Sequence, residues 1–393
     1  MQSNISITAP PEHLVRHKHV VVIIPDATRA LPTASLLAQF LPQLQTYRPL
    51  SIKVLVALGL HRAMTDEELS PITKLCTTYD VELVQHQPHD PQHLTRLADN
   101  IHLDPTQPDK GQALPVVLNA HLTCADTIFC LGLVEPHQYA GFSGGTKIIS
   151  IGCAGSETIR ALHGLELLRD PHTTLIETHK NPFRTALDRI ASYLNADLYG
   201  IHVVPSHEPT LFQGDLHECF TQSIAYAENT LLEPHETTYP WVHIKVSGVK
   251  GVNFYQASRA ATYVGLGPRS ILQPGAPILL EAPCTEGFGQ GRGEQMCAQI
   301  VQRGAKVLYD ELVGNTALPA HINLEGGAQR AYVLAKLLSK HPLILITPDP
   351  IASLPSDDIQ QFKTLDDAMH ALKLHGSNGP VLQNVFHHLP VLS

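Results

Sequence analysis

The chain has 393 residues, an apolar content of 43% and a formal charge of −9 at pH 7. This length suggests two domains, and a negative charge without any Lys/Arg run argues against a nucleic-acid-binding protein. No apolar run reaches transmembrane length, no signal peptide opens the chain, and the seven cysteines form no CxxC pair, so we expect a cytoplasmic protein with free thiols and no membrane partner.

Short apolar strands alternate with helical segments through the first half of the chain. Strands are predicted at 19–24, 53–58, 81–84 and 127–134. Helices are predicted at 35–44, from a capping box at 65–68 to about 79, and at 157–169. Strands that are apolar throughout and alternate with helices indicate a parallel sheet covered on both faces. We therefore predict a doubly wound, mostly parallel α/β domain over 1–235.

The second half begins after a polar, proline-bearing stretch at 231–240, which predicts a linker. Further strands are predicted at 242–246, 276–283, 305–310 and 342–347. With helical segments between them, they indicate a smaller α/β domain over 241–374 that closes a cleft against the first. The tail of about 375–393 is expected to pack back onto the first domain.

Polar residues directly follow three of the predicted strands in the first half. Asp26 and Arg29 follow the first strand, His61 follows the second, and His137 follows the strand at 127–134. Ligands of open parallel sheets bind beyond the carboxyl ends of the strands, so we expect these side chains to share one region. An arginine there suits a carboxylate or a phosphate, and two histidines suit proton transfer near neutral pH.

Each of these residues also has a simpler interpretation when it is taken alone. Asp26 is equally suited to capping a helix, and a single histidine is more often structural than catalytic. Lys147 alone would be a surface lysine. The pair Gly144 and Gly145 lets the backbone approach a bound group, and its amides are suited to face a phosphate. Neither a GxGxxG nor a Walker sequence is present, so the usual nucleotide fingerprints are absent.

Seven short segments occur in an order that resembles one family. They are PDATRA (25–30), GLHR (59–62), EPHQYAGFSGGTK (135–147), His163, NPFR (181–184), FYQASRA (254–260) and EAPCTEGFG (281–289). Together they resemble the nickel-dependent lactate racemase family, over about residues 20–290. The ordered set is far more specific than any single piece.

The resemblance implies a covalently held cofactor, the nickel-pincer nucleotide, which is a pyridinium mononucleotide whose two thio-carbonyl arms and a ring carbon bind nickel. By family position, Lys147 would carry it through a thioamide and His163 would be the fourth nickel ligand. A histidine packed on the sheet is the alternative for His163. The other residues expected at the cofactor are Asp26, Thr28, Gly144 and Gly145. Cofactor-biosynthesis proteins are the implied partners.

The implied activity is racemisation or epimerisation of a 2-hydroxy acid. Arg29 would hold the substrate carboxylate, while the C2 hydride moves to the cofactor and returns to the other face. His61 and His137 would remove and restore the hydroxyl proton. Removing hydride and proton separately avoids a carbanion beside a carboxylate, and nickel with sulfur donors agrees with ligand preferences.

The second domain would supply Tyr255, Gln256 and Arg259 to the substrate. Arg259 stands where the family has lysine, so the resemblance predicts a 2-hydroxy acid as substrate without specifying lactate. Two other functions fit parts of the pattern. One is a nicotinamide-dependent 2-hydroxy-acid dehydrogenase, which the missing GxGxxG argues against. The other is a nickel- or cofactor-binding protein without turnover.

Overall fold

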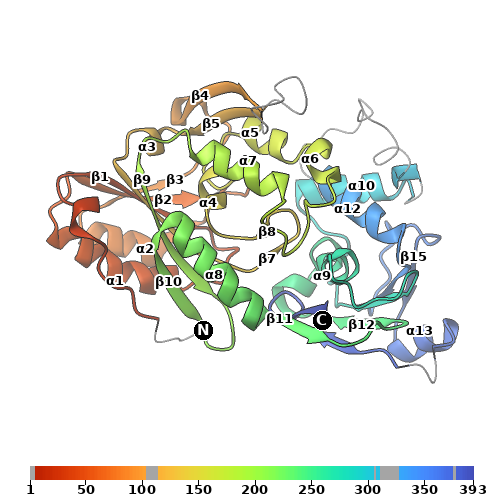
Figure 1. Cartoon of the computed structure of the whole chain (residues 1–393). Coiled ribbons are helices and arrows are strands. Elements are labelled where there is room, and N and C mark those ends of the chain that lie inside the picture. The colour runs from red at the N-terminus through yellow and green to blue at the C-terminus, as the bar shows by residue number, and fades with distance from the viewer. Residues whose placement is uncertain (1–4, 103–113, 305–306, 310–326, 375–377) are drawn as a thin grey trace. The chain divides into compact units, whose positions relative to one another are not determined.

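The computed structural model describes residues 5–102, 114–304, 307–309, 327–374 and 378–393 (Figure 1). The chain divides into two compact units, the first formed by 1–162 and 178–230 and the second by 163–177 and 231–393. The segment 163–177 therefore belongs to the second unit, although the first continues after it. The predicted domain boundaries and the cleft stay predictions.

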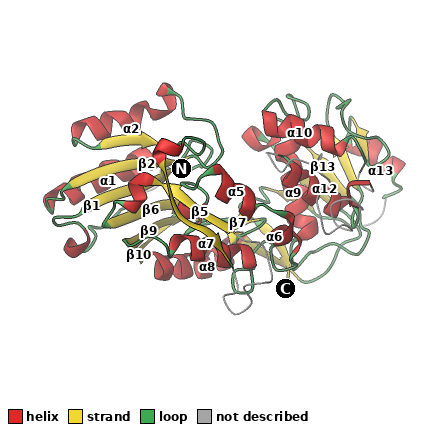
Figure 2. Cartoon of the chain, turned by 90° about the horizontal axis from the view of Figure 1, so that it is seen from above, coloured by secondary structure: helices red, strands yellow, loops and turns green. Residues whose placement is uncertain are grey.

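The first unit is built on a six-stranded sheet with the strand order β10-β9-β6-β1-β2-β3. Its strands are β1 (His19–Pro25), β2 (Ser51–Ala57), β3 (Glu82–Gln85), β6 (Thr127–Leu133), β9 (Asp197–Val204) and β10 (Thr210–Asp215). All neighbours pair in parallel except β9 and β10. Figure 2 shows β10, β9, β6, β1 and β2 side by side in this order. The predicted α/β class with a mostly parallel sheet is confirmed.

Both faces of this sheet are buried, which explains why its strands are apolar throughout. Val20 and Val22 of β1 pack in one core cluster with residues of α1 (Thr33–Thr46) and α2 (Asp66–Thr78). Successive side chains of a strand point to opposite faces, and the intervening Val21 and Ile23 are buried as well. A further helix, α4 (Lys147–Ser150), also contacts β1 and β6. The predicted capping box is present, with Thr65 as the N-cap of α2.

The strand order reverses at β1. From β1 the chain passes to β2 and β3 on one side of it, and then to β6 and β9 on the other. Adjacent strands whose connections leave in opposite directions create a crevice at their carboxyl ends, where ligands of such sheets bind. The β1–β6 pair is therefore where a site is expected.

The remaining elements of the first unit surround this sheet. They are η1 (Glu12–Leu14), η2 (Pro91–His93), the hairpin β4 (Leu94–Ile101) with β5 (Leu114–Asn119), α3 (Ala120–Thr123), the hairpin β7 (Pro136–His137) with β8 (Gly141–Phe142), α5 (Ser156–Leu162), α7 (Pro182–Ala191) and α8 (Leu216–Leu231). The single helix predicted at 157–169 is wrong. It is interrupted between α5 and α6 (Leu165–Arg169) because Gly164 has an extended backbone, with ψ 148°. His163 lies in this break.

The second unit is also α/β, with five parallel strands in the order β15-β14-β13-β12-β16. Its strands are β12 (Val242–Lys245), β13 (Ile278–Glu281), β14 (Leu343–Ile346), β15 (Ile359–Phe362) and β16 (Val381–Gln383). Its described helices are α6, η3 (Gly248–Gly251), α9 (Phe254–Leu266), α10 (Arg292–Val301), α12 (Ala328–Leu338) and α13 (Leu365–Ala371). A separate parallel pair joins β11 (Leu232–His235) to β17 (Leu389–Leu392).

The structure describes two segments of the second half for which the sequence made a prediction. In the predicted strand at 305–310, residues 307–309 are helical, and the other three lie outside the described residues. The C-terminal tail pairs within the second unit, where β16 joins β12 and β17 joins β11. Among the helices of the described chain, none combines the length and apolarity that crossing a membrane requires.

Three buried aromatic rings tie β6 to its surroundings and provide a test of the core. Phe129 contacts Phe40 and Tyr199 edge to face, with ring centroids 5.1 and 5.4 Å apart. Phe129→Ala leaves a cavity, so we expect it to lower the free energy of unfolding by about 3–5 kcal/mol. The measurement is urea unfolding followed by circular dichroism. The control Leu50→Ala, at a side chain that is 60% exposed, should change it by less than about 0.5 kcal/mol. Equal effects would contradict this description of the core.

Candidate functional site

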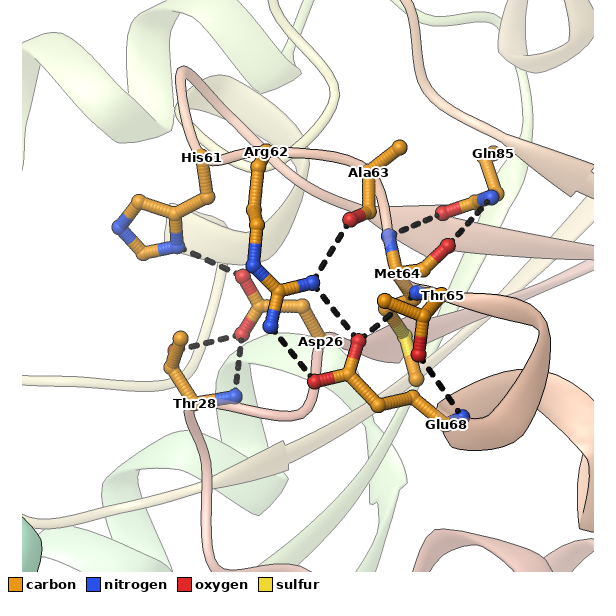
Figure 3. Close-up of polar contacts among 9 residues, drawn as sticks. All are labelled: Asp26, Thr28, His61, Arg62, Ala63, Met64, Thr65, Glu68 and Gln85. Carbon is orange, nitrogen blue, oxygen red and sulfur yellow. Dashed lines mark hydrogen bonds and ion pairs between the residues drawn. The ribbon is translucent and has the colours of Figure 1, made fainter. Parts of the chain in front are cut away.

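A buried carboxylate and a histidine meet at the ends of β1 and β2. The Nδ1 of His61 lies 2.6 Å from Oδ2 of Asp26, whose Oδ1 accepts hydrogen bonds from the backbone and hydroxyl of Thr28 (3.1 and 2.5 Å; Figure 3). Asp26 is buried, whereas the His61 side chain is 55% exposed. The carboxylate therefore fixes one ring nitrogen, and the rest of the imidazole faces outward.

The charge of Asp26 is stabilised by these contacts. Burial by itself raises the pKa of the Asp26 carboxyl, but the hydrogen bonds from His61 and Thr28 outweigh it and hold this pKa below its ordinary value. An ionised Asp26 only accepts hydrogen bonds, so Nδ1 of His61 carries the proton. In the neutral ring, Nε2 is then left with a lone pair and can act as a base.

A second pair spans the point where the strand order reverses. Nη1 of Arg29, which follows β1, lies 3.2 Å from Oε1 of Glu135, which follows β6. Both side chains are partly exposed, at 27% and 20%. The contact uses one guanidinium nitrogen, and a guanidinium has five N–H donors, so Arg29 retains the capacity to bind a second carboxylate.

The loop that carries His61 is fixed at both ends. Arg62 binds the carboxylate of Glu68 in α2 with two hydrogen bonds of 2.8 and 2.7 Å, and Gln85 of β3 bonds the backbone of Met64 (Figure 3). At the start of the loop, the Gly59 N–H donates to the Gly152 carbonyl at 2.9 Å. Because Gly152 lies just after α4, this bond joins the His61 loop to the helix that Lys147 begins.

His137 lies in the β7–β8 hairpin, and Lys147 follows this hairpin along the chain. His137 is in β7, which pairs with β8, and Lys147 is the first residue of α4. The Nδ1 of His137 accepts hydrogen bonds from the backbone of Tyr139 and Ala140, at 3.3 and 3.2 Å. In this arrangement the neutral ring carries its proton on Nε2. The two histidines are therefore held in opposite tautomers.

The two glycines between β8 and α4 are required by backbone conformation and by packing. Gly144 and Gly145 have φ angles of +85° and +59°, and a Cβ would lie 2.6 Å from Val134 or 2.9 Å from Phe220. The Gly145 N–H donates to Nε2 of the buried His202 at 3.2 Å. The phosphate contact predicted for this amide would require that bond to open.

His202 stays uncharged at neutral pH. Burial, and next to it the Arg184 charge, lower the pKa of His202 to about 3. It therefore serves as a fixed acceptor behind the loop and not as an acid–base group. His202 was not predicted from the sequence, because a histidine inside a strand carries no local signal of function.

The other predicted site residues belong to the second unit. His163 lies between α5 and α6, and Tyr255, Gln256 and Arg259 lie in α9. Nη1 of Arg259 is 3.4 Å from Oε1 of Gln256 on the same helix face. Burial raises the pKa of Tyr255, so its hydroxyl stays protonated at neutral pH. In the first unit, side-chain contacts thus join Asp26 to Thr28 and His61, and join Arg29 to Glu135.

Glu135 and Glu68 were missed in the sequence, although both had a signal. Glu135 stands two residues before His137, directly after the same buried strand, and the argument from strand ends applies to it equally. Glu68 was recognised as half of a capping box, and its second role, the bond to Arg62, depends on the loop path.

Within the described ranges, no group of three or more His, Cys, Asp or Glu is placed to hold a metal.

The chain is similar to known racemases in sequence and in fold. Residues 3–175 match the family model of the lactate racemase N-terminal domain. The lactate racemase of Thermoanaerobacterium thermosaccharolyticum is 24% identical over 84% of this chain and 74% of its own. That of Lactiplantibacillus plantarum is 26% identical over 91% of this chain and 81% of its own.

Two solved structures share the fold. The lactate racemase apoprotein from T. thermosaccharolyticum has a TM-score of 0.81 at 20% identity, covering 98% of this chain and 90% of that one. A protein from Thermotoga maritima has a TM-score of 0.72 at 18% identity, with 97% and 95% covered. At these identities, the likeness establishes the architecture.

The Arg62–Glu68 contact gives a pH-dependent test of the His61 loop. The Arg62 hydrogen bonds, helped by the backbone N–H of Thr65, lower the pKa of Glu68 to about 2. A carboxyl with a depressed pKa stabilises the fold above its unfolded pKa, about 4.3, and this contribution is lost as pH falls towards 2. We expect Glu68→Gln to destabilise the protein at pH 7, and the difference from wild type to shrink between pH 4.5 and 2.

The measurement is urea unfolding at several pH values, with Glu67→Gln as the matched control. Glu67 lies in the same first turn of α2 and is exposed, so its replacement should have little effect at any of these pH values. A Glu68→Gln difference that stays constant down to pH 2 would contradict the assigned ion pair.

Proposed function

We propose that the chain is a member of the lactate racemase family and that it racemises or epimerises a 2-hydroxy acid by moving the C2 hydrogen as hydride. The observation that carries this proposal is a pair of histidines held in opposite tautomers, His61 after β2 and His137 after β6. Strand β1, which Arg29 follows, lies between β2 and β6 in the sheet. Such a pair can accept a proton on one side and supply a donor on the other.

Arg29 binds the substrate carboxylate in this proposal, with its guanidinium oriented by Glu135. The contact at 3.2 Å holds one nitrogen, and the partial exposure of Arg29 leaves it accessible to a ligand. A carboxylate placed against Arg29 brings the C2 hydroxyl to the strand ends that carry His61. Nε2 of His61 then takes the hydroxyl proton, and Asp26 stabilises the imidazolium that forms.

The residues present fit the nickel-pincer nucleotide. Lys147 offers a primary amine at the start of α4, in a loop fixed by glycines at 144 and 145, and the His163 imidazole is a ligand type that nickel accepts. Lys147 would hold the group covalently and His163 would bind its metal. The chemistry that this group would supply when bound is the reversible acceptance of the substrate C2 hydride. Loading requires proteins that make the cofactor, and these are the proposed partners.

The second unit contributes Tyr255, Gln256 and Arg259 to substrate selection. The Tyr255 phenol, with its raised pKa, donates or accepts a hydrogen bond at neutral pH. Arg259 offers a planar fork where a lysine would offer a point charge. We therefore propose a substrate with a further polar group beyond the 2-hydroxy acid, so a panel of such acids is the right assay.

The first test follows the C2 hydrogen. Protein produced with the cofactor pathway is incubated with single enantiomers of 2-hydroxy acids, including lactate, and analysed by chiral chromatography. With a C2-deuterated substrate, the racemised product should keep its deuterium, because hydride transfer does not exchange with water. Label lost to the solvent would indicate proton abstraction at C2 and contradict the proposal.

The attachment is tested in parallel by intact mass. The wild type should carry an adduct. Lys147→Ala should lack both the adduct and all racemase activity. Lys180→Ala serves as the control, since Lys180 lies outside the hairpin and α4, and should keep the adduct. An adduct that persists in Lys147→Ala would show that another residue carries the group.

The role of His137 needs its own variant. To transfer a proton, its ring must become protonated at Nδ1, which breaks the hydrogen bonds from Tyr139 and Ala140. His137→Gln keeps a hydrogen-bond donor but cannot carry a proton. We expect His137→Gln to lose activity as fully as His137→Ala, about 10²-fold or more. Activity that survives in the Gln variant alone would reduce His137 to a hydrogen-bond donor.

A further inference from the structure

The segment NPFR (181–184) forms the start of α7 and contains none of the residues proposed to bind the substrate or the cofactor. Asn181 is the N-cap of the helix, where its side chain accepts the Arg184 N–H at 3.1 Å, and Pro182 occupies the first turn. Both Asn181 and Arg184 are buried. Two buried polar side chains at a helix start need partners, and their partners are all in one place.

Those partners are backbone carbonyls in the loop between His137 and Lys147, which contains β8 and the glycines at 144 and 145. The Arg184 guanidinium donates to the carbonyls of Ala140 (Nε 3.3 Å, Nη2 3.1 Å), Gly144 (Nη1 3.2 Å) and Phe142. The Asn181 amide donates to the Tyr139 carbonyl at 2.7 Å. Two side chains from one helix turn thus bind four carbonyls within six residues of the loop.

The same helix also holds the segment that contains Lys147. The Thr146 hydroxyl donates to Oδ1 of Asp188 at 2.5 Å, and the Ser150 hydroxyl donates to the Leu187 carbonyl at 2.7 Å. Lys147 lies between these two anchors. The contacts of α7 therefore begin two residues after His137 and continue to both sides of Lys147.

Burying a guanidinium costs free energy, because its charge loses contact with water. Burial lowers the pKa of Arg184 to about 10, which records the cost of removing its charge from water. The face of Phe220 offsets part of this cost, with its ring centroid 4.5 Å from Cζ of Arg184. An apolar side chain would fill the space without that cost, but it would leave the loop carbonyls without donors. The gain from the guanidinium is thus a fixed loop backbone.

We propose that Arg184 is a positioning residue for the reaction, which fixes the backbone of 139–144 so that His137 and Lys147 are presented in one geometry. Asn181 and the α7 contacts at 146 and 150 complete this clamp. The roles of His137 and Lys147 rest on the proposed function, whereas the clamp itself is a property of the apoprotein. It can therefore be tested without cofactor.

The test is hydrogen–deuterium exchange of the apoprotein with Arg184→Met and Arg184→Lys. We expect peptides covering 136–150 to exchange about 10-fold faster or more in the Met variant, and by an intermediate factor in the Lys variant, which keeps some donors. Peptides from β1 and β6 should be unchanged. The control Arg189→Lys makes the same substitution on α7 at a residue with no described bond to the loop, and should match wild type.

Two results would overturn the clamp: unchanged exchange at 136–150, or equal acceleration across the whole first unit, which would mean a general loss of stability. In loaded protein, Arg184→Lys should lower the adduct yield at Lys147 and lower kcat with little change in KM, since the substrate carboxylate binds Arg29. If the wild type itself carries no adduct, the proposed function fails, and the exchange result still decides the clamp.

Discussion

The parallel pairing of β1 with β6 is the constraint on which the site depends. The chain leaves these two strands in opposite directions along the sheet, which is the arrangement that opens a crevice at the carboxyl ends of parallel strands. Asp26 and Arg29 follow one strand and Glu135 follows the other, and the Arg29–Glu135 contact crosses the gap at 3.2 Å. The six-stranded sheet fixes these ends relative to each other, and loops alone would not.

A layer of buried polar groups transfers that rigidity to the functional side chains. Asp26 orients His61, Arg184 binds the carbonyls before Lys147, and His202 accepts the Gly145 N–H. Each is buried, and each would cost stability if its partner were removed. Burial raises the pKa of Asp26, but the hydrogen bonds from His61 and Thr28 outweigh it and keep Asp26 ionised. Burial lowers the pKa of His202 and keeps it neutral. Asp26 and His202 therefore each keep one charge state at neutral pH.

Local patterns in the sequence predicted some elements and missed others for identifiable reasons. The strands β1, β2 and β6 were found because both of their faces are buried, and the capping box at Thr65 was found because its two bonds are local. The helix predicted at 157–169 failed at Gly164, whose extended backbone separates α5 from α6. Residues 307–309 form a helix although their apolar run favoured a strand, which periodicity in so short a run does not distinguish.

The sequence by itself determined the α/β class and which residues stand at strand ends, because burial patterns and chain order are local properties. Only the tertiary structure decided which of these residues meet. His61 pairs with Asp26 across 35 positions, Arg29 with Glu135 across 106, and Arg184 with Ala140 across 44. Partners at such separations follow from the order of strands in the sheet and from the path of α7, which no short segment encodes. The hydrogen bonds at the site therefore depend on the order of the strands and on the path of the chain between them.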